Sequence, residues 1–295
     1  MRLAPLACAA AVLLALTSHA AAPPDAVASA SRSDEAVRRA PTAPDTWLDR
    51  AAFLRDRGDC DGAQSDLDRA LPLRAPDVHT LTFHAELDLC RGRYEDAVRD
   101  AGEALALDPG YVNAIRLRST ARIYAGDYDG AMGDLRRAHD EDPQPGDPRA
   151  FGAIQFMLGK YADSAATWAA ATGDPTNASY YPLWRYLALR RAHPSVDAST
   201  ILRQQSSTEW PRPVVDFYLG RIDSEALVAA AQASESRSPE HQLCEAEFYI
   251  GVADLDAGRL DEAFDLLRLA VTSCPQMSTE RKLAHAELRR TGLLE

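Results

Sequence analysis

Histidine is the side chain through which this sequence could most readily do acid–base or metal chemistry near neutral pH. Apart from His19, the histidines are His79, His84, His139, His193, His241 and His285. His79 and His84 are five positions apart, outside any H-E-x-x-H sequence that would place two metal ligands on one helix face. His241 and Cys244 have a spacing that suits a metal, but two further ligands are missing nearby. The spacing predicts no metal site and no cofactor.

Other constellations that would indicate catalysis are also missing from the sequence. It contains no G-x-S-x-G elbow, no phosphate-binding glycine loop and no nucleotide fingerprint. The 44 Asp and Glu residues fall at predicted helix starts and on solvated faces, where carboxylates are expected. We therefore expect no catalytic residues and a binding protein rather than an enzyme. The alternative is an enzyme of cell-wall turnover that uses His241 or the carboxylates.

Small residues that recur every 34 positions indicate the helices on which these side chains lie. Three series share this interval: Gly58, Gly92 and Gly126; Ala63, Ala97 and Ala131; and Ala70, Ala104 and Ala138. A 34-residue period with small and large apolar residues at fixed offsets is typical of the tetratricopeptide repeat (TPR), a pair of antiparallel helices. One pair cannot bury its own apolar face, so several must stack around a shared core. The predicted fold is an all-α TPR solenoid of about five repeats.

The predicted organisation has five segments. Residues 1–20 are expected to be a signal peptide, and residues 21–44, rich in Ala, Ser and Pro, a flexible lead in which SDEAVRRA could form one or two helical turns. Repeats 1–4 occupy residues 45–178, and an irregular helical segment follows over 179–243. Residues 244–295 form a fifth repeat and a helix that caps the exposed core of the array.

The N-terminal segment predicts export. A short positive start is followed by an apolar run from Leu3 to Leu16 and a cleavage signal that ends at Ala20. The run is shorter than the roughly 20 residues that a transmembrane helix needs. Because Cys8 lies at the start of the run and not at its end, we expect no lipid anchor. The formal net charge of −12 opposes binding to nucleic acid or to an anionic membrane. We expect a periplasmic protein without an integral membrane segment after cleavage.

Four cysteines, Cys60, Cys90, Cys244 and Cys274, follow the signal segment and allow three pairings. Repeat geometry favours two of the bonds. Cys60 opens the second helix of repeat 1, and Cys90 lies near the end of the first helix of repeat 2, so both lie on antiparallel neighbours. Cys244 and Cys274 meet at the open end of the last hairpin. We expect the disulfides Cys60–Cys90 and Cys244–Cys274, with four buried thiols as the alternative.

The first helix of each repeat should line the inner, concave face of a TPR array, where such proteins bind partners. Arg116 and Arg149 beside Asn113 could hold a peptide carboxylate by charge-assisted hydrogen bonds. The predicted binding groove consists of His79, Glu86, Asn113, Arg116, Tyr124, Arg149, Phe156 and Phe248. Proteins or peptides are the predicted partners.

The C-terminal half resembles the NlpI-type TPR lipoproteins of the bacterial envelope. The resemblance rests on Trp210, FYLGRI (217–222), GRLDEAFDLLRLAV (258–271) and, upstream, DPGYVNAIRLRS (108–119), and it covers roughly residues 45–290. It implies an envelope scaffold that dimerises and brings peptidoglycan hydrolases to a periplasmic protease. A structural assembly factor for a secretion or pilus machine is a further alternative.

Overall fold

The computed structural model describes residues 24–73, 75–203, 209–233 and 238–292. They belong to two compact units, Met1–Arg74 and Ala75–Glu295, and each unit is described by itself. The predicted signal peptide and Cys8 lie outside the described residues. Where the structure is described, it is built from helices and contains no strand, and none of the helices is long and apolar enough to span a membrane.

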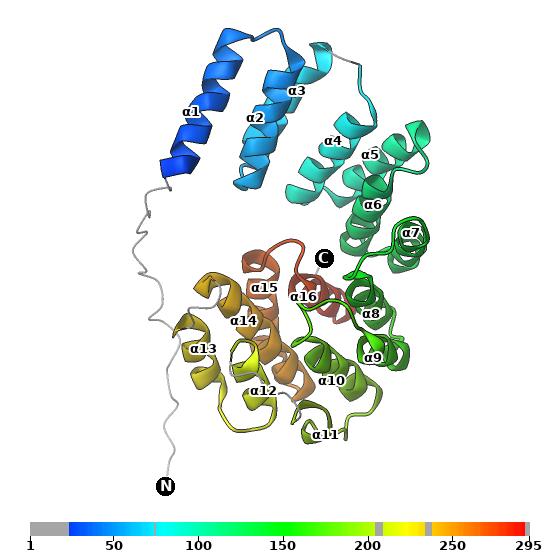
Figure 1. Ribbon diagram of the computed structural model, residues 1–295. Coiled ribbons are helices and arrows are strands. Elements are labelled where there is room, and N and C mark those ends of the chain that lie inside the picture. The colour runs from blue at the N-terminus through cyan, green and yellow to red at the C-terminus, as the bar shows by residue number, and fades with distance from the viewer. Residues whose placement is uncertain (1–23, 74, 204–208, 234–237, 293–295) are drawn as a thin grey trace. The chain divides into compact units, whose positions relative to one another are not determined.

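The helices follow one another as Figure 1 shows. The first unit contains α1 (Pro24–Arg39), α2 (Pro44–Asp56), α3 (Cys60–Ala70) and the 3-10 turn η1 (Leu71–Leu73). The second unit begins with α4 (Val78–Cys90), α5 (Tyr94–Leu107), α6 (Val112–Ala125), α7 (Tyr128–Glu141), α8 (Asp147–Met157) and α9 (Tyr161–Ala170). It continues with α10 (Tyr181–Ala192), α11 (Ser199–Leu202), α12 (Arg212–Tyr218), α13 (Ser224–Ala233), α14 (Pro239–Asp256), α15 (Leu260–Ser273) and α16 (Thr279–Arg290).

The all-α TPR prediction is confirmed. Helix pairs of the repeat type are α2 with α3, α4 with α5, α6 with α7, α8 with α9, and α14 with α15. A glycine in the left-handed conformation ends the first helix of these pairs, as Gly126 does after α6 with φ of 84°. This conformation, which residues with a Cβ rarely adopt, lets the chain reverse within two residues.

Close helix crossings explain why the small residues recur. Ala63, Ala97 and Ala131 are all fully buried. In the fourth repeat Gly152 allows a close crossing, since a Cβ added to it would lie 2.2 Å from Trp168 Nε1. There the smallest residue on α8 faces the largest side chain on α9, and the indole fills the space that the glycine leaves.

A polar pair joins the two helices of each of the first three repeats. In each, a side chain on the first helix binds an aspartate sixteen residues later on the second. The pairs recur at the 34-residue interval: Arg50 with Asp66, His84 with Asp100, and Arg118 with Asp134. All three aspartates are buried, so each needs this partner to offset its loss of hydration.

The predicted flexible lead is wrong over most of its length, because residues 24–39 form α1. The segment is rich in alanine, which favours helix, and Glu35 pairs with Arg38 and Arg39 one turn later. Val37 is buried in a small cluster with Trp47 on α2. These contacts order a segment whose composition alone suggested a linker.

The irregular segment contains α10 to α13, and serine side chains cap two of the helices that follow it, α14 and α16. α14 begins at Pro239, five residues before the predicted start of the fifth repeat at Cys244. The predicted Cys244–Cys274 disulfide is present, with a Cα–Cα distance of 5.2 Å. Cys60 and Cys90 belong to different units, so their pairing stays a prediction.

Candidate functional site on the inner face of the second unit

The last helix occupies the inner face of the second unit. α16 packs on α15, as a capping helix should, but it also packs on α8, α14 and α6 (Figure 1). Leu283, Ala284 and Leu288 on α16 are fully buried. The Ser278 side chain caps the helix by accepting a hydrogen bond from Arg281 N at 3.1 Å. The face on which the predicted groove residues lie is therefore covered in part by the chain itself.

Hydrogen bonds to backbone groups fasten α16 and the loop before it to α6 and α4. The Tyr124 hydroxyl donates to the Gln276 carbonyl, and Gln276 Nε2 donates to the Leu89 carbonyl. Arg289 Nη1 donates to the Tyr124 carbonyl at 3.1 Å. A Cβ on Gly126 would lie 2.9 Å from the Arg289 guanidinium, so a side chain there would displace that guanidinium in addition to adopting a positive φ.

His285 packs edge-on against a pair of stacked tyrosine rings at the same contact. Its ring makes edge contacts with Tyr124 at 5.5 Å and with Tyr94 at 6.1 Å, and these two tyrosines stack on each other. Burial, with Arg289 and Arg281 close by, lowers the pKa of His285 to about 4. Among the described residues, its Nδ1 has no hydrogen-bond partner. His285 is therefore a neutral core residue near neutral pH.

Two buried glutamates form the polar centre of the C-terminal half. Trp184 Nε1 and the Tyr249 hydroxyl each donate to Glu280 at 3.0 Å. Glu245 accepts from the Tyr180 hydroxyl at 2.9 Å and from Trp210 Nε1. Burial and then the nearby Glu245 raise the pKa of Glu280 to about 7. The donors lie on α10 and α14 or just before α10 and α12, so these carboxylates tie the half together.

His241, the residue of the enzyme alternative, also belongs to this network. Its Nε2 lies 3.1 Å from Glu245 Oε1, and Glu245 is buried. The same carboxylate holds Tyr180 and Trp210, which is the environment of a structural ion pair. The geometry explains the position of His241 without a catalytic role.

Three of the predicted groove residues are in fact core residues. Tyr124, Phe156 and Phe248 are at most 5 % exposed. Their aromatic rings were expected to face a ligand, but α16 and the neighbouring helices cover them. This part of the groove prediction is wrong, because the sequence did not show that the chain returns to its own inner face.

The polar members of the predicted groove do not form one site. Arg116 is bound to Asp147 at 2.5 Å, and that carboxylate also contacts His139 at 2.8 Å. His79 is exposed and contacts the Tyr111 hydroxyl at 3.0 Å. The remaining members are Asn113, which is exposed, and Glu86 and Arg149, which are half-buried. Arg116 is thus neutralised within the protein and cannot serve as an open carboxylate clamp.

A pocket lies outside this face, where α9, the following loop, α10 and α11 meet. Its volume is about 530 Å³. Buried Trp168 and Tyr181 form part of its wall, and exposed Thr172 and Arg185 contribute polar groups. Asp174 is held there by the Tyr181 hydroxyl at 2.9 Å. An aromatic wall with a few fixed polar groups is typical of a site for a ligand or a partner's side chain.

A second pocket of about 290 Å³ lies between α16 and the helices it covers. Its lining combines Tyr128, Phe156, Met157 and Tyr161 with Ala286, Glu287, Arg289 and Arg290 of α16. Glu287 is buried and pairs with Arg290 and Arg191. These ion pairs hold the solvent-facing edge of α16.

Comparison with known proteins agrees with the fold. No family model matches the sequence. The chain is similar to the crystal structure of a tetratricopeptide repeat protein from Parabacteroides merdae, with a TM-score of 0.53 at 14% identity over 83% of this chain and 98% of that one. It is also similar to the C-terminal part of a TPR repeat-containing protein from Cytophaga hutchinsonii, with a TM-score of 0.49 at 12% identity over 87% and 93% of the two chains. The similarity to the Parabacteroides merdae structure supports the TPR fold.

Sequence reasoning missed the return of α16 and the buried glutamates. The one available signal for α16 was its pattern of Leu283, Ala284 and Leu288, which gives an apolar stripe wider than a cap on one helix requires. The partners of Glu280 lie 31 and 96 positions away in the sequence. Spacing within one helix pair cannot reveal contacts of that range.

Proposed function

We propose that the protein is an exported, non-catalytic TPR scaffold that binds segments of other proteins. The observation that carries this proposal is a TPR array with a polar-rimmed, aromatic pocket at α9 to α11. Stacked helix repeats offer extended surfaces to partners, and their helices seldom bring catalytic groups together. Because α16 covers the inner face between α6 and α8, we assign partner binding to this pocket and its surroundings.

The chemistry of the pocket indicates what it would hold. Trp168 and Tyr181 suit an aliphatic or aromatic side chain, and Arg185 at the rim suits a neighbouring acidic group. A partner segment with one large apolar residue beside an aspartate or glutamate fits both features.

The finer role follows from the sequence resemblance. We propose that the scaffold works in the bacterial cell envelope, self-associates, and brings peptidoglycan hydrolases to a periplasmic protease. The signal segment and the FYLG segment, which spans the end of α12 and the following turn, support this assignment.

The experiment that tests the scaffold function places a photo-crosslinking amino acid at Arg185, with Arg136 on α7 as the matched exposed control. We expect crosslinks to a discrete partner from position 185 in intact cells and none from position 136. We also expect Arg185→Glu to lose the complex while its thermal melting stays unchanged.

Equal labelling from both positions, or turnover of peptidoglycan by the purified chain that disappears in His241→Ala, would overturn the proposal. Light scattering of the purified mature chain tests self-association separately.

A further inference from the structure

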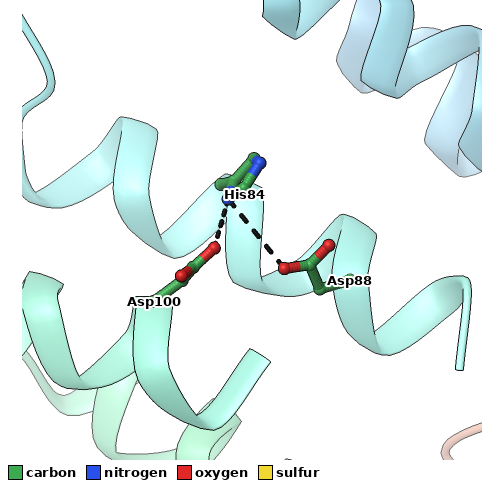
Figure 2. Close-up of side chains that lie close together, drawn as sticks. All are labelled: His84, Asp88 and Asp100. Carbon is green, nitrogen blue, oxygen red and sulfur yellow. Dashed lines mark hydrogen bonds and ion pairs between the residues drawn. The ribbon is translucent and has the colours of Figure 1, made fainter. Parts of the chain in front are cut away.

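The polar pair of the second repeat differs from its equivalents in having a third member. His84 and Asp88 lie one turn apart on α4, and Asp100 faces them from α5 (Figure 2). His84 Nδ1 hydrogen-bonds Asp100 Oδ2 and lies 4.0 Å from Asp88 Oδ2. One ligand atom from each side chain falls within 4.8 Å of the other two. One imidazole nitrogen and two carboxylate oxygens therefore converge on a common point.

Arginines hold the other oxygen of each carboxylate. Arg93 donates to Asp88 Oδ1, and Arg99 Nε donates to Asp100 Oδ1 at 3.0 Å. The Oδ2 atoms are thereby turned toward His84. Hydrogen bonds of this kind to the far oxygen orient ligating carboxylates in metal sites.

Burial distinguishes the three side chains. The side chains of Asp88 and Asp100 are 1% and 6% exposed, whereas that of His84 is 28% exposed. The exposed edge of His84 gives solvent a route to the cluster.

In the first and third repeats, the positions equivalent to His84 and Asp88 hold arginine or an apolar residue. In the third repeat, Arg118 and Arg122 both bind Asp134, at 2.6 and 2.7 Å. In the first repeat, Arg50 binds Asp66 and Leu54 stands in the place of Asp88. The second repeat thus has an imidazole where repeats 1 and 3 have an arginine, and a carboxylate where they have a leucine or a second arginine.

We propose that His84, Asp88 and Asp100 bind a divalent transition-metal ion. A mixed nitrogen and oxygen donor set suits Mn²⁺, Co²⁺, Ni²⁺ or Zn²⁺, whereas Ca²⁺ and Mg²⁺ prefer oxygen ligands alone. The ion uses the Nδ1 lone pair, so the proton between Nδ1 and Asp100 moves to Nε2 or to solvent. Water completes the coordination from the exposed edge of His84.

The test uses tag-free mature protein dialysed against EDTA and titrated with Co²⁺ and Zn²⁺ by visible absorption and calorimetry. We expect one saturable site per chain. His84→Arg installs the residue of repeats 1 and 3, so it should keep the pair with Asp100 and the melting temperature. It should weaken metal binding at least about tenfold, the lower end of what removing even a second-shell partner costs. Asp88→Leu, with the residue of repeat 1, should do the same.

His79→Ala is the control and should bind metal as the wild type does. A complementary variant transfers the site to the third repeat: Arg118→His combined with Arg122→Asp should add a second site per chain. The proposal is overturned if the wild type shows no saturable binding, or if His84→Arg binds as tightly as the wild type. It is also overturned if His79→Ala abolishes the signal.

Discussion

The helix pairs α4–α7 and the C-terminal half from α10 to α16 are both helical, but their side chains are held over different ranges. In α6 and α7 a representative contact, Arg118 with Asp134, spans sixteen positions. Within the C-terminal half, Trp184 reaches Glu280 across 96 positions. Between the two regions, Tyr124 on α6 reaches Gln276, just before α16, across 152 positions. The comparison teaches that the repeat positions build the array, and that α16 then closes the inner face through contacts no single repeat contains.

Loss of an α16 core residue should have the largest effect. Leu288 is fully buried, whereas Leu269 on α15 is 48% exposed. We expect Leu288→Asp to lower the free energy of unfolding by at least about 4 kcal/mol, since it buries an unpaired charge. Leu269→Asp should change it by no more than about 0.5 kcal/mol. Urea unfolding followed by tryptophan fluorescence measures both. Similar losses for the two variants would show that α16 is not docked.

Removal of the disulfide in the last repeat should have the next largest effect on stability. Cys244 and Cys274 close a loop of 30 positions. Replacing both by serine should cost about 3–4 kcal/mol on the chain-entropy model. Calorimetric melting of the oxidised protein and of the double variant gives the difference. A melting temperature that is unchanged by the double variant, or by reduction of the wild type, would contradict it.

His285 and Glu280 should make the free energy of unfolding depend on pH in opposite directions. The His285 pKa is lowered to about 4, so the unfolded chain takes up a proton before the folded one as pH falls from 6.5. His285 thus contributes stability above pH 6.5 that is lost toward pH 4. The shift is about 2.5 pKa units, and at about 1.4 kcal/mol per unit this amounts to about 3.5 kcal/mol.

The contribution of Glu280 to stability changes with pH in the opposite direction. Its pKa is raised to about 7, so the stability it contributes is complete below pH 4.5 and is lost as pH rises through 7. Relative to the wild type, we expect His285→Gln to remove the loss at acid pH and Glu280→Gln the loss at neutral pH. Urea midpoints between pH 4 and 8 measure both, and parallel curves for the two variants would contradict the assignment.

The smallest expected effect on stability is the difference between substitutions at two equivalent glycines, Gly92 and Gly126. Gly126→Ala and Gly92→Ala both place a side chain at positive φ, which should cost about 1 kcal/mol each. Only Gly126 meets Arg289, so its substitution should cost about 1 kcal/mol more. Thermal melting gives the two values. In an Arg289→Ala background the two substitutions should become equal, and a persistent difference would contradict the contact.

The sequence predicted the repeats because their packing is local. The 34-residue glycine and alanine series fix each hairpin, and they placed Ala63, Ala97 and Ala131 in the core correctly. The groove prediction failed at Tyr124 and Phe248, since an aromatic residue on a first helix fits an open groove and a covered one equally well. His84 was dismissed for its spacing to His79. Its spacing to Asp88, one turn on, was the signal that it shares a face with a second ligand.

Hydrogen exchange of α16 in the full-length mature chain tests the central claim most directly. If α16 occupies the inner face of the second unit, its amide protons should exchange as slowly as those of α14 and α15. Gly126→Ala should accelerate exchange in α16 while α3 stays unchanged. Rapid exchange of α16 in the wild type, while α14 and α15 remain protected, would contradict the account.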